Sequence, residues 1–391
     1  MLSAEAFRQQ TCDWLEENCP QSMRGPYTTA DGCWGGRNWV FASEDQRRWL
    51  GVMAGRGWTA PEWPREYGGG GLSKTEAKIL DEEMARIRAK PPLASFGIWM
   101  LGPALLRHGS EQQKLEHLPR ICRGEIRWCQ GYSEHSAGSD LAGLQTRAED
   151  RGDHFLVNGS KIWISYADKA DWIFCLVRTD FEAPKHQGIS FLLFDMASSG
   201  VSTKPIHLIS GDSSFCETFF DNVEVPKGNL VGALNKGWDI AKYLLTHERE
   251  AIGDVGLGGS GQALHEIAIE KLGRVDGRLV GGGLRSEVAR LQIDELAFAL
   301  TAERFSDEAK AGQGVGAASS MLKYHGAELN KLRLELLMAI SGSEGLGWEG
   351  ERFAGGELAR TWLRSRANSI EGGTSEIQLN IIAKRILGLP G

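Results

Sequence analysis

The sequence has no long apolar run and no leader-like opening. Its 391 residues are 41% hydrophobic, and no apolar stretch approaches the roughly 20 residues that a membrane-spanning helix needs. The opening stretch MLSAEAFRQQTCDWLEEN does not place a basic segment before an apolar core, as a secretory signal peptide does. We therefore expect a first helix here, no membrane partner and a cytoplasmic location.

Paired cysteines and clusters of basic residues are also missing. The seven cysteines form no CxxC pair and stand at positions 12, 19, 33, 122, 129, 175 and 216. Their odd number and spacing favour buried, reduced thiols over a disulfide framework or a zinc site. A net charge of −7 without a basic run is a poor match for nucleic-acid phosphates. We therefore expect no metal site and no nucleic-acid partner.

Three regions of different texture follow one another along a chain that is long enough for two or three domains. Residues 1–124 consist of helix-like segments and loops, residues 125–236 consist of short β-type runs separated by turns, and residues 237–391 return to helical periodicity. The expected fold is α+β. It has an N-terminal helical domain (1–124), a middle β-barrel or β-sandwich domain (125–236) and a C-terminal helical bundle (237–391).

Local patterns add detail to each region. Ser73 and Glu76 have the spacing of a helix-capping box ahead of an apolar-periodic run. Within HFLVNGSKIWIS, Asn158-Gly159 predicts the tight turn of a β-hairpin. Six residues of the last region keep i+3/i+4 spacing and predict one face of a long helix, and these are Leu322, His325, Leu329, Leu332, Leu336 and Ile340.

The stretch GYSEHSAGSDLAGLQTRA, residues 131–148, is rich in glycine and small hydroxyl residues. Ser133, Gly138 and Ser139, with their backbone N–H groups, allow a phosphate or a heterocycle to approach closely. Taken alone, this loop is better explained as an ordinary Ser/Gly turn.

Together with two later stretches, this loop resembles the acyl-CoA dehydrogenase family of flavoproteins. The three motifs are SEHSAGSDLAGLQT at 133–146, NGSKIWISYADKADWIFCLVRTD at 158–180 and GGTSEIQLNIIAKRILGLP at 372–390. The resemblance covers nearly the whole chain, from GWTAPEWPREYGGGGLS at 57–73 to the end. It implies that the C-terminal region is a four-helix bundle.

The resemblance also implies non-covalently bound FAD. Ten residues match family positions that contact it, and they are Gln130, Tyr132 and Ser133 at the pyrimidine edge, Gly138 and Ser139 near the pyrophosphate, Trp163, Ile164 and Ser165 over the flavin, and Thr374 and Glu376 on the adenosine side. Main-chain donors and an aromatic wall that excludes water suit a hydride transfer. Ser139 and Arg249 match positions expected to contact the acyl-CoA substrate.

Two positions depart from the family pattern. Many relatives carry an Arg-x-x-Phe-Gly motif whose arginine reaches FAD in a neighbouring subunit, whereas this chain reads KLGRVDGRLVGGGLRSEV, residues 271–288. Arg274 and Arg278 are the candidates to replace that arginine. His135 stands where relatives usually have proline, and we interpret it as a tolerated loop substitution.

Family members oxidise an acyl-CoA between Cα and Cβ, with a carboxylate taking the α-proton and flavin N5 taking the β-hydride. In one branch the base precedes Gly-Thr in the C-terminal motif, where this chain has Gly372, with Glu371 one residue earlier. A second branch has its base on the first helix of the C-terminal bundle, where Glu248 lies at the centre of an apolar stripe. We therefore expect Glu248 to be the base, the Gly372 N–H to hold the thioester carbonyl, and Glu371 to be the alternative base. A buried structural ion pair is the competing explanation for Glu248.

The resemblance implies an enzyme that passes electrons to a soluble electron-transfer flavoprotein and assembles as a homo-oligomer, either a dimer or a tetramer. Two alternatives stay open. The chain is one subunit of a hetero-tetramer in which one type of chain lacks the base or a full flavin site, or it is a flavin-dependent monooxygenase or oxidase on the same scaffold.

Overall fold

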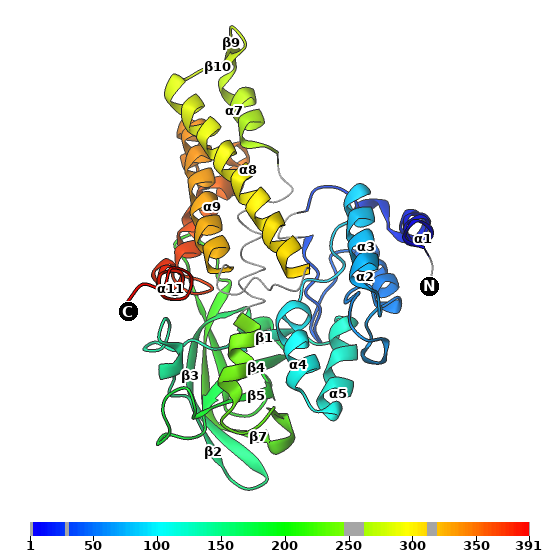
Figure 1. Cartoon of the computed structure of the whole chain (residues 1–391), viewed down its shortest axis with the longest axis vertical. Coiled ribbons are helices and arrows are strands. Elements are labelled where there is room, and N and C mark those ends of the chain that lie inside the picture. The colour runs from blue at the N-terminus through cyan, green and yellow to red at the C-terminus, as the bar shows by residue number, and fades with distance from the viewer. Residues whose placement is uncertain (1–2, 28–30, 246–261, 311–318, 391) are drawn as a thin grey trace. The chain divides into compact units, whose positions relative to one another are not determined.

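Two compact units make up the chain (Figure 1). The computed structural model describes residues 3–27, 31–245, 262–310 and 319–390. Unit 1 takes its described residues from Met1–Ile206 and Ser214–Leu244, and unit 2 takes them from His207–Ser213 and Leu245–Gly391. The mixture of helices with a large sheet confirms the α+β expectation. The domain boundaries after residues 124 and 236 stay predictions.

Helices form the N-terminal part of unit 1. Their bounds are α1 (Ala4–Asn18), α2 (Glu44–Gly55), α3 (Lys74–Arg86), α4 (Gly102–His108) and α5 (Glu111–Cys122). The predicted capping box is confirmed at the start of α3, because the Ser73 N–H donates to the Glu76 carboxylate at 2.8 Å and Ser73 Oγ accepts from the Glu76 N–H at 3.3 Å. Leu15, Trp49 and Met53 are fully buried in the core that α1, α2 and α3 share.

The rest of unit 1 is an eight-stranded sheet. Its strands are β1 (Trp128–Gly131), β2 (Arg147–Asp150), β3 (His154–Ser165), β4 (Trp172–Arg178), β5 (Ile189–Asp195), β6 (Val201–Ile206), β7 (Phe215–Pro226) and β8 (Leu230–Val231). They run in the order β6-β7-β3-β2-β4-β5-β8, and β1 pairs in parallel with β4. The long antiparallel pair β3–β7 extends from His154 opposite Pro226 to Ser165 opposite Phe215. β3 carries several residues of the site described below.

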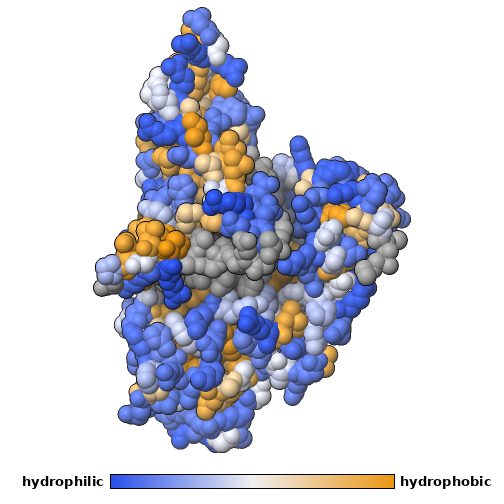
Figure 2. All heavy atoms as spheres, viewed as in Figure 1, coloured by the Kyte–Doolittle hydropathy of each residue, from blue (hydrophilic) through white to orange (hydrophobic). Residues whose placement is uncertain are grey.

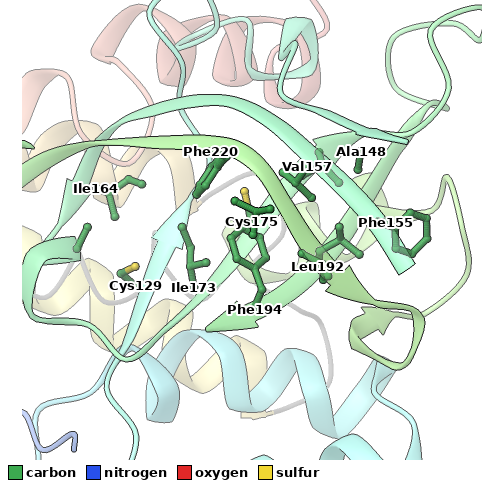
Figure 3. Packing of buried hydrophobic residues seen from close by; sticks show 14 of the residues in the cluster. Cys129, Ala148, Phe155, Val157, Ile164, Ile173, Cys175, Leu192, Phe194 and Phe220 are labelled. Atoms are coloured by element: carbon green, nitrogen blue, oxygen red, sulfur yellow. The ribbon is translucent and has the colours of Figure 1, made fainter. Parts of the chain in front are cut away.

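Apolar side chains from several strands form the core of the sheet (Figure 3). Cys129, Cys175 and Cys216 belong to this core and are 0% exposed. Burial raises the pKa of the Cys175 thiol to about 12. All seven cysteines of the chain are free and six are buried, which confirms the expectation of buried thiols.

The hairpin turn predicted at Asn158-Gly159 is wrong, because β3 continues through both residues. Only Gly159 has a positive φ, at +145°, and a Cβ there would lie 2.8 Å from Cα of Thr146 on the neighbouring chain segment. The register with β7 shifts at this point, and the Asn158 side chain accepts a hydrogen bond from the Asn222 N–H at 2.9 Å. The asparagine and glycine therefore mark a β-bulge and a close backbone approach.

Unit 2 is largely helical. Its elements are α7 (Leu264–Leu272), the hairpin strands β9 (Arg274–Val275) and β10 (Arg278–Leu279), α8 (Gly282–Lys310), α9 (Ser319–Ser341), α10 (Glu357–Ser365) and α11 (Ser375–Ile381). Residues from α7, α8 and α9 share one apolar core. No helix among the described residues is long and apolar enough to cross a membrane.

The long helix predicted around Leu322–Ile340 is confirmed as α9, but its buried face differs in part from the predicted stripe. Leu329, Leu336 and Ile340 are buried as expected, whereas Leu332 is 41% exposed. His325 is also exposed, and the helix buries Lys323, which is not part of the predicted stripe, at 0% exposure. A lysine inside the core is costly unless its ammonium is bound.

A short segment between β6 and β7, His207–Ser213, groups with unit 2. Arg360 on α10 donates to the Ser210 carbonyl at 2.9 Å and to the Gly355 carbonyl at 3.1 Å. Its guanidinium lies 3.9 Å from the centre of the Trp348 ring. Gly211 has a φ of +80°, and any side chain there would collide with the Arg360 guanidinium. The sequence of unit 2 is therefore discontinuous.

Candidate active site

The loop after β1 is fixed to β3 at several points. The Ile162 N–H donates to the Ser133 carbonyl at 2.9 Å, and Glu134 and Ala137 exchange two backbone hydrogen bonds of 3.2 and 3.0 Å that form a tight turn. The loop that resembles a flavin-contact motif is therefore held in one conformation against the strand that carries the second such motif.

A buried ion pair strengthens this attachment. Lys161 on β3 is 0% exposed and donates to the Glu134 carboxylate at 2.8 Å and to the Tyr132 carbonyl at 3.0 Å. The Gln145 and Thr146 N–H groups also donate to Glu134, at 2.6 and 2.9 Å. Burial raises the pKa of the Glu134 carboxyl, but the Lys161 ammonium and these donors outweigh burial and leave that pKa lowered.

Several features of this region suit a ligand with acceptor atoms and a flat ring. The Gln130 Nε2 group is buried and has no hydrogen-bond partner among the described residues, a loss of about 1–3 kcal/mol if nothing binds it. Gly138 and Ser139 are exposed, and no atom lies within 4 Å of the place of a Cβ on Gly138. A phosphate group can therefore reach this backbone closely.

Trp163 occupies an unusual position on β3. Its φ is +61°, the register between β3 and β7 shifts between Lys161 and Ile164, and its indole is 54% exposed. A large aromatic residue in left-handed backbone is strained, and such strain is found at functional sites. Ile164 turns the other way, into the sheet core at 1% exposure, and Ser165 is half-buried. The exposed Trp163 indole therefore offers a flat surface that suits a ring-shaped ligand.

The predicted residues of unit 2 lie in and after the loop between α10 and α11. Thr374 caps α11 by accepting from the Ile377 N–H at 3.2 Å, and Glu376 lies in the first helical turn. Backbone hydrogen bonding and Thr374 lower the pKa of the Glu376 carboxyl. Gly372 and Gly373 both have left-handed backbone, with φ of +64° and +89°, which glycine adopts without strain.

Glu371 does not have a free carboxylate. One of its oxygens accepts from Arg364 at 2.8 Å and the other accepts from the Asn368 side-chain amide at 2.6 Å. Both oxygens are therefore engaged within unit 2, which favours a structural role for this residue.

The remaining predicted residues fall into three groups. Glu248 and Arg249 lie outside the described residues. Arg274 and Arg278 are exposed in the β9–β10 hairpin. His135 is 58% exposed, and its Nε2 lies 2.6 Å from the Glu217 carboxylate.

Sequence reasoning missed the buried partners of these loops. Glu134 and Lys161 fall inside the quoted motifs, but their separation of 27 residues gives no local signal of a pair. Lys323 was adjacent to the predicted apolar stripe. The residues three and four positions after it are Gly326 and Ala327, and small residues on one face of a helix are the signal that another segment approaches there.

Comparisons with known proteins agree on one family. Residues 36–125, 129–223 and 235–387 match the models described as acyl-CoA dehydrogenase N-terminal, middle and C-terminal domains. Acyl-CoA dehydrogenase IpdE1 of Mycolicibacterium smegmatis is 35% identical over 408 residues, which cover 100% of this chain and 99% of that protein. Acyl-CoA dehydrogenase FadE34 of Mycobacterium tuberculosis is 38% identical over 351 residues, which cover 90% of this chain and 47% of that longer protein.

Solved structures agree as well. The structure described as the Tcur3481-Tcur3483 steroid ACAD has a TM-score of 0.79 and 29% identity and covers 99% of this chain and 97% of that chain. The ChsE4-ChsE5 complex from Mycobacterium tuberculosis has a TM-score of 0.75 and 28% identity and covers 99% and 98% of the two chains.

Proposed function

Because this chain belongs to the acyl-CoA dehydrogenase family, we propose that it is an FAD-dependent enzyme that oxidises an acyl-CoA thioester to the trans-2-enoyl-CoA. The observation that carries the proposal is the way in which the loop after β1 is attached to β3, because both segments contain the residues that resemble flavin contacts. A buried ion pair joins the two segments, the buried Gln130 amide nitrogen lacks a hydrogen-bond partner among the described residues, and the Trp163 indole is exposed. FAD, when bound, would supply the acceptor for the β-hydride.

The described residues divide the task of holding the cofactor. The Gln130 amide and the backbone of Tyr132 and Ser133 would donate to the ring edge, and the exposed backbone at Gly138 and Ser139 would accommodate the pyrophosphate. The Trp163 indole and the Ser165 hydroxyl would cover the ring and keep water out. Thr374 and Glu376 would contact the adenosine side.

Glu248 is our proposed base, and the Gly372 N–H is our proposed donor to the thioester carbonyl. The engagement of both Glu371 oxygens, by Arg364 and Asn368, supports this choice because a base needs an oxygen that is free to receive the α-proton. Arg249 would lie near the CoA moiety.

The test is anaerobic bleaching of the flavin absorbance on mixing with acyl-CoA thioesters. The panel contains straight, branched, dicarboxylic, cyclic and steroid acyl groups. We expect Glu248→Gln to lose bleaching and Glu371→Gln to keep it. Bleaching of Glu248→Gln at the wild-type rate would refute the base assignment, and failure of the wild-type protein with every thioester would refute the proposed reaction. Peroxide formation without an added electron-transfer flavoprotein would favour an oxidase.

We further propose that the chain assembles with a second acyl-CoA dehydrogenase-type subunit, either identical or related. The face of α8 exposes Ile293, Leu296 and Leu300 at 67%, 62% and 58%. In an antiparallel pair of α8 helices centred between residues 296 and 297, Ile293 faces Leu300 and Arg290 faces Glu303, so apolar and charged positions are both complementary.

A second apolar surface covers α11 and the residues that follow it (Figure 2). Its exposed residues are Leu379, Ile386, Leu387 and Leu389. Light scattering and flavin content of the chain purified alone separate the two assemblies. A yellow homo-oligomer supports the first, whereas a colourless chain that gains flavin only with a related partner supports the hetero-oligomer.

A further inference from the structure

Lys323 on α9 is a buried cation that the proposed reaction does not use. Its side chain is 0% exposed. The ammonium donates to the Asn368 carbonyl at 3.0 Å and to the Gly373 carbonyl at 2.8 Å. Among the described residues Lys323 forms no ion pair. The carboxylate of Glu371 is paired with Arg364 and that of Glu328 is paired with Lys331. The groups that bind this ammonium directly are therefore backbone carbonyls, and the carboxylates of Glu371, Glu328 and Glu376 act on it without a direct ion pair.

The two acceptors lie on either side of residues 369–372. Gly372 and Gly373 take left-handed backbone, and their carbonyls accept from the Gln378 amide at 3.0 and 3.4 Å. Several carbonyls thus converge at the base of the loop. Their partially negative oxygens repel one another unless hydrogen-bond donors lie among them. The Gln378 amide and the Lys323 ammonium both donate to these carbonyls, and Lys323 links both ends of the loop to α9.

We propose that Lys323 is a positioning residue of the active site, whose ammonium holds the Asn368 and Gly373 carbonyls and thereby keeps the Gly372 N–H in place for the thioester carbonyl. This inference rests on the proposed function, in which Gly372 contacts the substrate. Lys323 itself acts through the loop and touches no reacting atom.

The first measurement is independent of activity. Amide hydrogen exchange in the FAD-loaded protein without substrate compares wild type with Lys323→Met, which keeps side-chain length but removes the charge and the donors. We expect the amides of residues 369–373 to exchange at least about tenfold faster, while protection in the β3–β7 pair is unchanged. Lys271→Met is the matched control, because Lys271 on α7 is 39% exposed and its only described ion pair, with Glu344, is 3.7 Å long.

The second measurement is the anaerobic flavin reduction rate as a function of acyl-CoA concentration. Displacement of a donor by about 1 Å costs about 100-fold in rate, so we expect a loss of that order at saturating substrate. The apparent Kd should change much less, because the CoA contacts are untouched. A general loss of structure would instead change rate, Kd and flavin content together.

The outcomes separate the two proposals. If wild-type flavin is reduced and Lys323→Met matches it in exchange and in rate, the role of Lys323 is refuted. If no thioester reduces wild-type flavin, the proposed function fails, whereas unchanged exchange in Lys323→Met would still refute the grip on the loop. If Lys323→Met does not fold, Lys323→Gln, which retains a neutral donor, carries the same comparison. Failure of both variants to fold assigns Lys323 to general stability and refutes the positioning role.

Discussion

Two lysines of this chain, Lys161 in unit 1 and Lys323 in unit 2, are both 0% exposed and both bind carbonyls of a loop expected to contact cofactor or substrate. Their partners differ. Lys161 also has the Glu134 carboxylate at 2.8 Å, whereas Lys323 is bound only by carbonyls. Unit 1 therefore fixes its loop with an ion pair, and unit 2 fixes its loop with a lysine that has no directly bound carboxylate among the described residues. The first arrangement suits a rigid cofactor platform, and the second leaves its loop sensitive to the protonation of one side chain.

Removal of Lys161 from its ion pair with Glu134 should give the largest loss of stability among the variants considered. Lys161→Met leaves the Glu134 carboxylate buried without its cation, and we expect a loss of about 3–5 kcal/mol in the free energy of unfolding. Urea denaturation of the apoprotein measures it. The double variant Lys161→Met/Glu134→Leu should recover part of the loss, because no buried charge then remains. A single-variant loss below about 1 kcal/mol would contradict the description of this pair as a structural lock.

Lys323→Met should destabilise the chain less. It leaves carbonyls with one donor fewer but leaves no charge behind, and we expect a loss of about 1–3 kcal/mol by the same urea measurement. A loss equal to that of Lys161→Met would remove the energetic distinction between the two sites.

The two sites should also respond to pH in opposite ranges. Burial lowers the pKa of Lys323 below 10.5, partly offset by Glu371, Glu328 and Glu376 and reinforced by Lys331. The unfolded chain then binds more protons than the folded chain between the folded pKa and 10.5, so this group makes stability rise with pH across that range. The alkaline side of the stability profile therefore reports on Lys323.

The lowered pKa of Glu134 has a consequence of the same sign, but in the acid range. The contribution of the Glu134 carboxylate to stability is fully present above pH 4.5 and is lost as the pH falls through the lowered pKa of the folded chain. Unfolding free energies of wild type and Lys323→Met, measured from acid to alkaline pH, should differ in slope only on the alkaline side. A difference in slope confined to acid pH would show that the lowered pKa is wrongly assigned to Lys323.

Trp163→Ala should have the smallest effect on stability and a clear effect on ligand binding. The indole is 54% exposed, so its removal should change the free energy of unfolding of the apoprotein by less than about 1 kcal/mol. FAD affinity, measured by fluorescence titration, should fall because a ring-stacking surface is lost. Unchanged affinity would show that this residue belongs to the scaffold and not to the cofactor site.

The features that were predicted correctly depend on residues that are close together in the sequence. The Ser73–Glu76 cap, α9 and the free cysteines follow from local spacing and composition, and all three were confirmed. The Asn158-Gly159 turn failed because the partner of Asn158 is Asn222, 64 residues away. The two buried lysines were missed for the same reason, since a lysine is ordinarily solvated and only its tertiary partners make burial favourable. The roles of Glu248 and Arg249 stay predictions.

The segment His207–Ser213 also has a consequence for the modularity of the family. Because Ser210 and Gly211 complete the surroundings of Arg360, a gene fragment that begins at residue 245 would encode unit 2 without one of its own parts. Recombination between two relatives at residue 245 would combine α10 from one protein with the β6–β7 connection from the other. The two segments would then not have evolved together. The two halves of such a chimera should therefore exchange successfully only when this seven-residue connection is inherited with the helical half.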